Sequence, residues 1–419
     1  MTRVREMAPA RFRAPAPRLP RAVWVLGLVS LFVDLASELL YPVVPLYLAG
    51  ALGAPLVLIG LIEGAAEVTA GFSKGYFGGL SDRLGRRKAF VVAGYALSAL
   101  SKPLPGLWAA WPGVLVSRVV DRVGKGVRTA PRDALLAAYA EPGTRGRVFG
   151  LHRALDTLGA ALGPALALAW LAARPGDYRP LFFIAFVPAA IGTALTLLVR
   201  EQAPDAPAPA SAPAAPAERR GALVAFWRSA PPDYRRLVGR LVAFALVNSS
   251  DVFLLLKARE ALGDAWALGG YILYNLVYAA AAYPAGRASD RFGRRPTLAA
   301  GLVLYAAAYA GFALAGPVVP DTAPVFAGLF ALYGLYAALT EGVAKAWLAD
   351  LVPAGAAQGR AFGLHAAATS LAALVASVSA GALWEGVGPA APFAVAAAGA
   401  LAVAASLTRV QAPRAGTAP

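Results

Sequence analysis

Long apolar runs follow one another along the whole chain, and each is close to the twenty or so residues that a membrane-spanning helix needs. Short segments rich in arginine, glycine and proline separate the runs. The pattern predicts an all-α membrane protein with twelve transmembrane helices. The first six are expected near residues 22–48, 56–80, 89–107, 112–137, 148–172 and 180–200. The second six are expected near 237–261, 266–288, 297–316, 323–350, 361–384 and 390–408.

A Pro/Ala-rich run over 203–217 separates the two sets, and this composition is typical of a flexible linker. The predicted division is a basic N-terminal tail (1–21), an N-terminal six-helix bundle (22–200), a linker (201–236), a C-terminal six-helix bundle (237–409) and a C-terminal tail (410–419).

Composition supports a membrane location. The chain has 419 residues, of which 58% are hydrophobic and 15% charged, whereas soluble proteins carry about a quarter charged residues. Most of the net charge of +16 lies in the tails and in the loops of one side, and the opposite loops hold little beyond Lys102, Arg174 and Arg179. This asymmetry predicts a multi-pass protein of the inner (cytoplasmic) membrane, with both termini and the linker in the cytoplasm. The basic side chains are expected to meet lipid headgroups, and nucleic-acid binding is not expected.

Several kinds of chemistry are not expected from this sequence. There is no cysteine, and the two histidines are His152 and His365, so disulfides and Cys- or His-rich metal sites are not predicted. No P-loop, nucleophile elbow or metal-binding motif occurs. We therefore expect no enzymatic activity, no cofactor and no bound metal, and we expect a monomer.

Two segments occur twice at nearly the same offset. The segment Gly146–His152 returns as Gly359–His365, and Ser81–Arg87 returns as Ser289–Arg295. These repeats predict duplicated six-helix halves with a substrate path at their interface.

The loop between predicted helices two and three, GGLSDRLGRRK over 78–88, resembles the G-x-L-x-D-R-x-G-R-R-K loop of the major facilitator superfamily. The resemblance implies two pseudo-symmetric six-helix bundles and a secondary transporter that works by alternating access. In the family this loop is a cytoplasmic latch, in which the aspartate lies near a helix terminus and gains from unpaired N–H groups. The implied latch residues are Gly78, Asp82, Arg83, Gly85, Arg86, Arg87, Gly286, Asp290, Arg291, Gly293 and Arg294.

A second family motif is matched in part. Gly159, Gly163 and Pro164 agree with the fifth-helix pattern G-x-x-x-G-P-x-x-G-G of efflux antiporters, in which Ala167 and Leu168 here replace the closing glycines. This resemblance implies antiport. The segments 34–38 and 121–128 resemble a widespread, mostly uncharacterised bacterial and archaeal branch of the family.

Ionisable side chains within the predicted spans are costly in a bilayer and are therefore functional candidates. Asp34 and Glu38 share one face of the first helix. Neighbouring carboxylates repel in a low dielectric, so one of them is expected to keep its proton near neutrality and to act as a proton carrier. The candidates for proton coupling or for the substrate cavity are Asp34, Glu38, Glu63, Glu67, Arg118, Asp121, Arg122, Lys125 and Asp251.

A cytoplasmic gate follows from the repeat. Arg128 and Glu341 occupy equivalent places on predicted helices four and ten and are expected to attract when the cytoplasmic side is closed. Arg132 and Lys345 lie one turn further on and belong to the same gate. Tyrosines at helical spacing on predicted helix eight are expected to pack rather than to bind; they are Tyr271, Tyr274 and Tyr278.

The preferred function is proton-coupled efflux of a small molecule, with protons and membrane lipid as the other partners. An alternative within transport is uptake or export of an anionic metabolite or metal chelate, held by Arg118, Arg122 and Lys125. A membrane sensor or assembly partner without transport is the alternative from another class.

The charge asymmetry generates a topology prediction. Single cysteines introduced within 81–88, 201–236 or 289–296 should react with a membrane-impermeant reagent only from the cytoplasmic side, because these segments carry the topogenic basic residues. The native chain has no cysteine, so each label is unique. Labelling of any one segment from outside would contradict the twelve-helix map.

Overall fold

The structure is a computed structural model that describes residues 19–54, 56–141, 143–201, 224–249, 251–352 and 357–408. The expected tails and most of the expected linker lie outside these residues. Nearly all of the described chain is helical, apart from turns, loops and one isolated bridge between Ala315 and Val319. The prediction of an all-α protein is confirmed.

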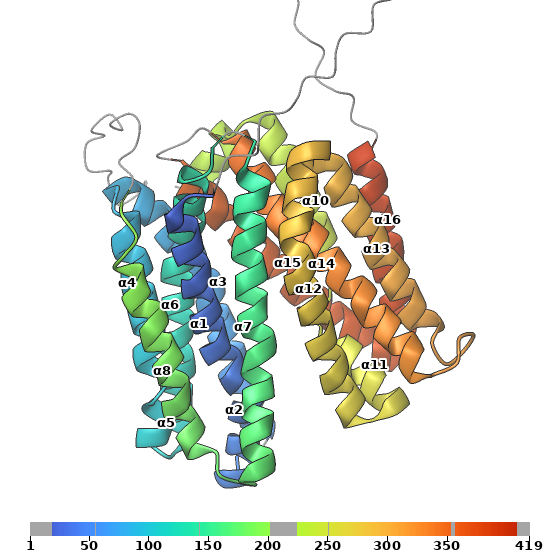
Figure 1. The fold of residues 1–419 in the computed structure, drawn as a ribbon. Coiled ribbons are helices and arrows are strands. Elements are labelled where there is room, and N and C mark those ends of the chain that lie inside the picture. The colour runs from blue at the N-terminus through green and yellow to red at the C-terminus, as the bar shows by residue number, and fades with distance from the viewer. Residues whose placement is uncertain are drawn as a thin grey trace, which may run out of the picture.

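Each half of the described chain contains six spans (Figure 1). The helices of the N-terminal half are α1 (Arg21–Leu40), α2 (Val43–Leu46), α3 (Leu56–Leu84), α4 (Arg87–Ser101), α5 (Leu104–Leu107), α6 (Trp111–Ala138), α7 (Arg145–Ala173) and α8 (Arg179–Thr196), with a π-helical turn over Tyr47–Ala51. Those of the C-terminal half are α10 (Pro232–Ala245), α11 (Val252–Leu262), α12 (Asp264–Phe292), α13 (Arg294–Leu314), α14 (Ala323–Leu351), α15 (Gln358–Gly386) and α16 (Ala391–Thr408).

Two predicted helices are interrupted. The first span breaks after α1, where Pro42 and Pro45 remove backbone donors, and it resumes as α2. The seventh span breaks between α10, which ends at Ala245, and α11, which begins at Val252. This span also begins at Pro232, inside the segment expected to be linker, and residues 224–229 are helical as well.

Apolar side chains face outward where lipid would lie. Six helical stretches of the described chain are long and apolar enough to cross a membrane by length and composition: Arg21–Leu46, Arg145–Ala173, Arg179–Thr196, Arg294–Leu314, Ala323–Leu351 and Gln358–Gly386. Helix α6 does not qualify because it carries many charges, but these charges are turned inward: Arg118, Asp121, Arg128, Arg132 and Asp133 are all buried. Burial away from lipid is what permits such a helix in a bilayer.

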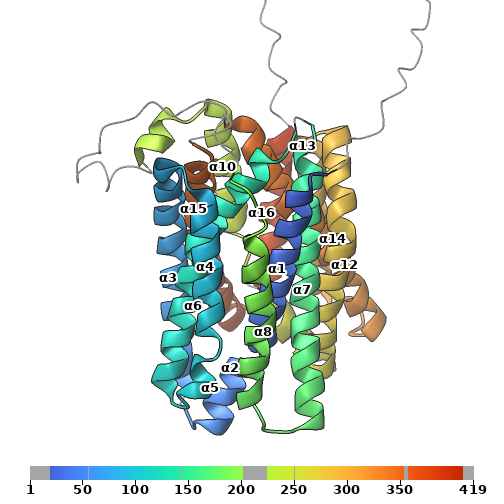
Figure 2. The same cartoon turned by 60° about the vertical axis from the view of Figure 1, so that its left-hand side comes forward.

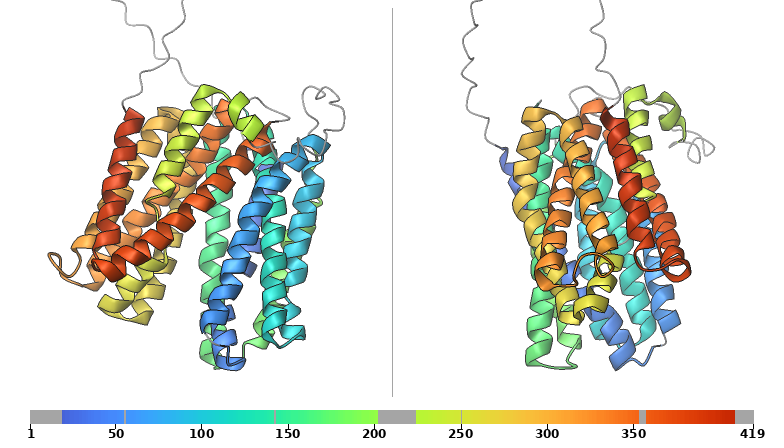
Figure 3. Two further views of the ribbon diagram at one scale, coloured as in Figure 1. Left: turned by 180° about the vertical axis from the view of Figure 1, so that it is seen from behind. Right: turned by 90° about the vertical axis from the view of Figure 1, so that its right-hand side faces the viewer.

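The two halves lie side by side and meet along two helix pairs, α7 with α12 and α3 with α15 (Figures 1 and 2). They are joined at the end where α3 and α12 finish and α7 and α15 begin, which we call the latch end. The ribbons of the halves diverge toward the opposite end, as Figure 1 and the rear view in Figure 3 both show. The structure is therefore closed at the latch end.

Glycines allow the closest helix approaches within the N-terminal half. A Cβ atom on Gly163 would lie 2.5 Å from the backbone nitrogen of Leu39 and 2.7 Å from the carbonyl oxygen of Leu35. Gly159 meets the same backbone one turn away. These two glycines of the fifth-helix motif let α7 lie directly on α1, and Pro164 lies inside α7 beside them.

Glycines also form the contact between the halves. A Cβ atom on Gly78 of α3 would lie 2.6 Å from the carbonyl oxygen of Gly359 on α15. In the other helix pair, a Cβ atom on Gly286 of α12 would lie 2.7 Å from the carbonyl carbon of Gly146 on α7. The latch glycines at positions 78 and 286 therefore let two backbones touch across the interface.

Candidate functional site

The first latch carboxylate reaches across the interface to a helix N-terminus. Asp82, near the end of α3, accepts hydrogen bonds from the backbone N–H groups of Gly359 (3.1 Å) and Arg360 (2.7 Å) at the start of α15. Arg87 donates to the same carboxylate at 3.2 Å. A carboxylate at this position satisfies orphan N–H groups and meets the positive end of the helix dipole.

The second latch carboxylate repeats the arrangement in the opposite direction. Asp290 of α12 accepts the N–H groups of Gly146 (2.8 Å) and Arg147 (2.9 Å) at the start of α7. Arg294 binds Asp290 at 2.5 Å and also reaches Asp350 of α14 at 2.9 Å. Each half thus places one carboxylate on a helix of the other half.

The remaining latch residues either form turns or are exposed to solvent. Gly85 and Gly293 have φ angles of +61° and +100°, which favour glycine in the turns after α3 and α12. Arg83, Arg86 and Arg291 are exposed and do not contribute to the carboxylate contacts.

Below the latch, a chain of charged side chains connects α1 to α14. The carboxyl groups of Asp34 and Asp156 are in hydrogen-bonding contact. Arg153 of α7 binds Asp156 at 2.5 Å and forms an ion pair with Glu341 of the other half. The carboxyl pair of Asp34 and Asp156 in the N-terminal half is therefore two contacts from the interface.

A second ion pair joins the halves beside the first. Lys345 of α14 binds Asp133 of α6 at 2.7 Å, and Arg132 binds the same carboxylate at 3.0 Å. Arg132 also reaches Ser30, whose hydroxyl lies 2.7 Å from His152 Nε2. Arg132 and Lys345, both expected at the gate, are thus brought together by Asp133.

The expected pair of Arg128 and Glu341 is not formed. Arg128 is buried within its own half, where it donates to Ser98 at 2.8 Å and lies 4.6 Å from the centre of the Tyr95 ring. Glu341 is bound by Arg153 instead. The repeat correctly placed Glu341 at the interface, but position 128 lies on the face of α6 that packs on α4.

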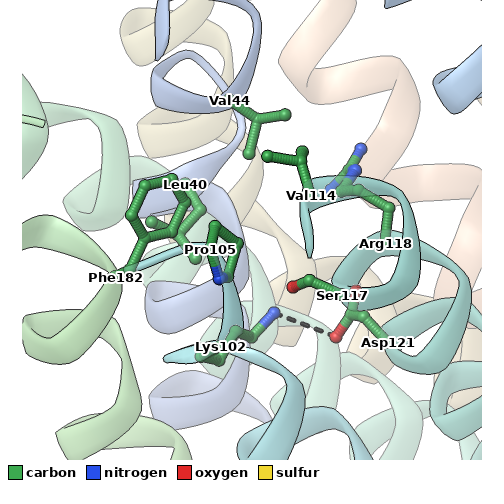
Figure 4. A pocket seen from close by; sticks show the side chains of 9 residues that line it. All are labelled: Leu40, Val44, Lys102, Pro105, Val114, Ser117, Arg118, Asp121 and Phe182. Carbon is green, nitrogen blue, oxygen red and sulfur yellow. Dashed lines mark hydrogen bonds and ion pairs between the residues drawn. The ribbon is translucent and has the colours of Figure 1, made fainter. Parts of the chain in front are cut away.

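Another buried pair lies at the far end of α4. Lys102, expected in a loop, is buried because it binds Asp121 at 2.9 Å and Ser37 at 3.0 Å. Figure 4 shows both side chains beside Arg118 at a cavity of about 10 Å³. This volume holds about one water molecule and no substrate. Asp121 and Lys102 therefore form a buried ion pair with no room for a substrate. In the sequence, only their residue types indicated such a pair.

Glu38 lies one turn beyond Asp34 on α1 and contacts the other half. Tyr271 of α12 donates a hydrogen bond to it at 3.4 Å, and Lys125 and Arg122 of α6 face it. Lys125 also faces Asp34, so α6 supplies positive charge to the carboxylates of α1. The other two candidate acids, Glu63 and Glu67, lie on α3, and their side chains are outside the described residues.

Asp251 lies where the seventh span is broken. Tyr274 of α12 donates to its carboxylate at 2.9 Å, and Tyr333 of α14 donates at 2.6 Å. Tyr274 thus packs on its neighbours and also holds a buried carboxylate. The signal in the sequence was a carboxylate next to Asn and Ser in an otherwise apolar helix, which indicates buried hydrogen-bond partners.

Two pseudo-symmetric six-helix halves, with charged side chains buried between them, define a multi-pass membrane transporter fold. Comparison with known proteins agrees. The family model of the Major Facilitator Superfamily matches residues 26–272 and 259–419. The chain belongs to this superfamily.

Relatives support the same assignment. An uncharacterized transporter of this type from Methanocaldococcus jannaschii is 33% identical over 374 residues, covering 88% of this chain and 89% of the relative. Multidrug resistance protein MdtH of Aeromonas hydrophila is 32% identical over 157 residues, 37% of this chain and 38% of that protein. The crystal structure of the human organic anion transporter MFSD10 superposes with a TM-score of 0.76 and 20% identity, covering 94% of this chain and 100% of that one.

The latch contacts generate a prediction about conformation. Asp82→Asn and Asp290→Asn should each shift the protein toward a form open at the latch end, by about ten- to hundredfold, because each removes a charge-assisted contact worth about 1.5–3 kcal/mol. Spin labels on cysteines at Glu141 and Phe292, exposed positions of the two halves, report the opening as a longer distance. Asp233→Asn, an exposed carboxylate, is the matched control. Unchanged distance distributions in both latch variants would show that these loops only set topology.

The ion pair between the halves generates a second prediction. In double-mutant cycles read by the same labels, Arg153→Gln and Glu341→Gln should be coupled by about 0.5–3 kcal/mol because the two residues touch. Arg128→Gln and Glu341→Gln should be additive to within about 0.5 kcal/mol, because they do not touch. If instead Arg128→Gln is coupled to Glu341→Gln and Arg153→Gln is not, the result would support the gate that the repeat predicted.

Proposed function

We propose that this chain is a proton-coupled antiporter that exports a small molecule by alternating access. In this proposal it lies in the inner membrane with both termini in the cytoplasm, and the latch end faces the cytoplasm. The Arg-rich latch loops support that orientation.

The contact between Asp34 and Asp156 is the observation that carries the proposal. Two ionised carboxylates repel at this separation, and a hydrogen bond between them requires that one be protonated. Both side chains belong to the interior of the bundle, where leaving two negative charges side by side is costly. The pair is therefore suited to take up and release one proton.

The position of the pair links the proton to the conformation. The guanidinium group of Arg153 binds both Asp156 in its own half and Glu341 in the other half. When the shared proton leaves, a second negative charge appears beside Arg153 and competes with Glu341 for it. Deprotonation then weakens an attraction between the halves and favours opening at the latch end. By linkage, opening favours proton release to the same degree.

Export rather than uptake is supported by two similarities. The fifth-helix residues Gly159, Gly163 and Pro164 match part of the efflux antiporter motif. A relative over about a third of the chain is named for multidrug resistance.

Transport of an organic anion is the second candidate. Arg122 and Lys125 of α6 supply positive charge on the side of α1, and this charge would suit an anionic ligand. Arg118, the third residue expected to hold an anion, lies on the same helix. A structural neighbour named as an organic anion transporter shares the fold. Substrate panels that contain both amphipathic cations and organic anions separate the two candidates. If no compound moves although the latch opens and closes, a sensor without transport is favoured.

The proton pair generates a prediction. In proteoliposomes with an imposed pH gradient, Asp34→Asn should abolish gradient-driven accumulation while counterflow of the same compound continues, because the amide keeps the hydrogen bond to Asp156 but cannot ionise. Initial rates should lose their dependence on pH. Glu385→Gln, at the exposed end of α15, is the matched control. A pH dependence in Asp34→Asn equal to that of the parent protein would rule out this residue as the carrier.

A further inference from the structure

The break in the seventh span creates an acidic position with no counter-charge. Helix α10 ends at Ala245 and α11 begins at Val252, so Asp251 stands at the start of α11. Its side chain makes no capping bond to its own helix. Within the described residues, its carboxylate is held by the hydroxyls of Tyr274 and Tyr333, and no Lys, Arg or His pairs with it.

Three other buried acids differ from Asp251. Asp121 has Lys102, Asp133 has Lys345 and Arg132, and Asp156 has Arg153; these pairs are all within hydrogen-bonding distance. A buried carboxylate without a cation is costly. The C-terminal half therefore lacks a positive charge at the place where its seventh span is interrupted.

Further polar oxygen atoms belong to residues beside Asp251 in the chain or on a helix that faces it. Ser249 is 6% exposed, and its hydroxyl has no hydrogen bond of good geometry in the described part of the chain. The same holds for the carboxamide oxygen of Asn248 and for the hydroxyl of Tyr309. Tyr309 faces both Ser249 and Tyr333. Tyr309 can share a hydrogen bond with Ser249 or Tyr333, so the carboxamide oxygen of Asn248 is the atom that most needs a ligand, an ion or a water molecule.

The tyrosine rings leave no face for an organic cation. Tyr271 and Tyr274 pack edge to face at 5.3 Å, and Tyr274 packs on Tyr333 at 5.2 Å. Tyr305 and Tyr309 are stacked at 4.0 Å. The rings cover one another, so only their hydroxyl oxygens remain for a ligand, and a cation–π site is not favoured.

We propose that Asp251, Asn248 and Ser249, together with the hydroxyls of Tyr274 and Tyr333, form a sodium-binding site at the break of the seventh span. The donors are all oxygen atoms, which suit a hard cation, and one carboxylate matches a single positive charge. No cluster of three or more His, Cys, Asp or Glu occurs in the described residues, which disfavours a transition metal. The start and end of interrupted membrane helices suit such ions because their backbone groups are free.

The site is independent of the proton pair, because Asp34 and Asp156 belong to the other half. Its occupation would fix α11 to α12 and α14 through the ligands that these helices contribute. Sodium would then stabilise the C-terminal half without touching the ion pairs at the interface.

The test is equilibrium binding of radioactive sodium to the purified full-length protein, with choline replacing sodium at constant ionic strength. The parent protein should bind sodium saturably, with one ion per chain. Ser249→Ala and Tyr333→Phe, which remove single hydroxyls, should each weaken binding by about tenfold. Asp251→Asn should abolish it. Asp321→Asn, an exposed carboxylate of the same half, should leave it unchanged.

Three outcomes would overturn the proposal. One is equal binding by Asp251→Asn and the parent protein, and another is displacement of sodium by tetramethylammonium as readily as by unlabelled sodium. The third is the absence of any sodium binding between about pH 6 and 9, which would mark Asp251 as a proton site. Because the assay needs no transport, its failure leaves the proton-coupled function untouched, and the loss of pH coupling in Asp34→Asn leaves the sodium site untouched.

Discussion

The closed arrangement of this protein depends on two carboxylates that cap helices belonging to the opposite half. Asp82 caps α15 and Asp290 caps α7, each through two backbone N–H groups. A helix N-terminus in a membrane protein has N–H groups that neither lipid nor its own helix can satisfy. Each half therefore completes the hydrogen bonding of the other, and the halves cannot separate at this end without returning those groups to water.

The contact between the halves also requires the glycines at positions 78 and 286. A side chain at position 78 or 286 would hold the helix pairs apart, since the carbonyl oxygen of Gly359 and the backbone of Gly146 already occupy that space. The carboxylates could then no longer reach their N–H groups. Steric fit and charge act together here, which makes the contact all-or-none and gives the molecule discrete states rather than a continuous hinge.

The sequence predicted the scaffold well because the scaffold rests on local patterns. Apolar length predicted the spans, the duplicated segments predicted the pseudo-symmetry, and the family resemblance implied the capping role of Asp82 and Asp290. Pairing below the latch could not be predicted in the same way. Arg128 and Glu341 are equivalent in the repeat, but which arginine meets Glu341 depends on how α6 and α7 are rotated about their axes. Helix α7 turns Arg153 toward Glu341, whereas α6 turns Arg128 toward α4. Lys102 was misplaced because a lysine at a helix end looks like a loop residue until its partner, Asp121, is known.

The two halves share a backbone plan but differ in the chemistry that they bury. In the N-terminal half three buried acids, Asp121, Asp133 and Asp156, are matched with lysines and arginines. In the C-terminal half Asp251 is surrounded by tyrosine hydroxyls, which can donate to a carboxylate but cannot neutralise it. Any positive charge at Asp251 must therefore arrive from outside the described chain, as a proton or as a metal cation.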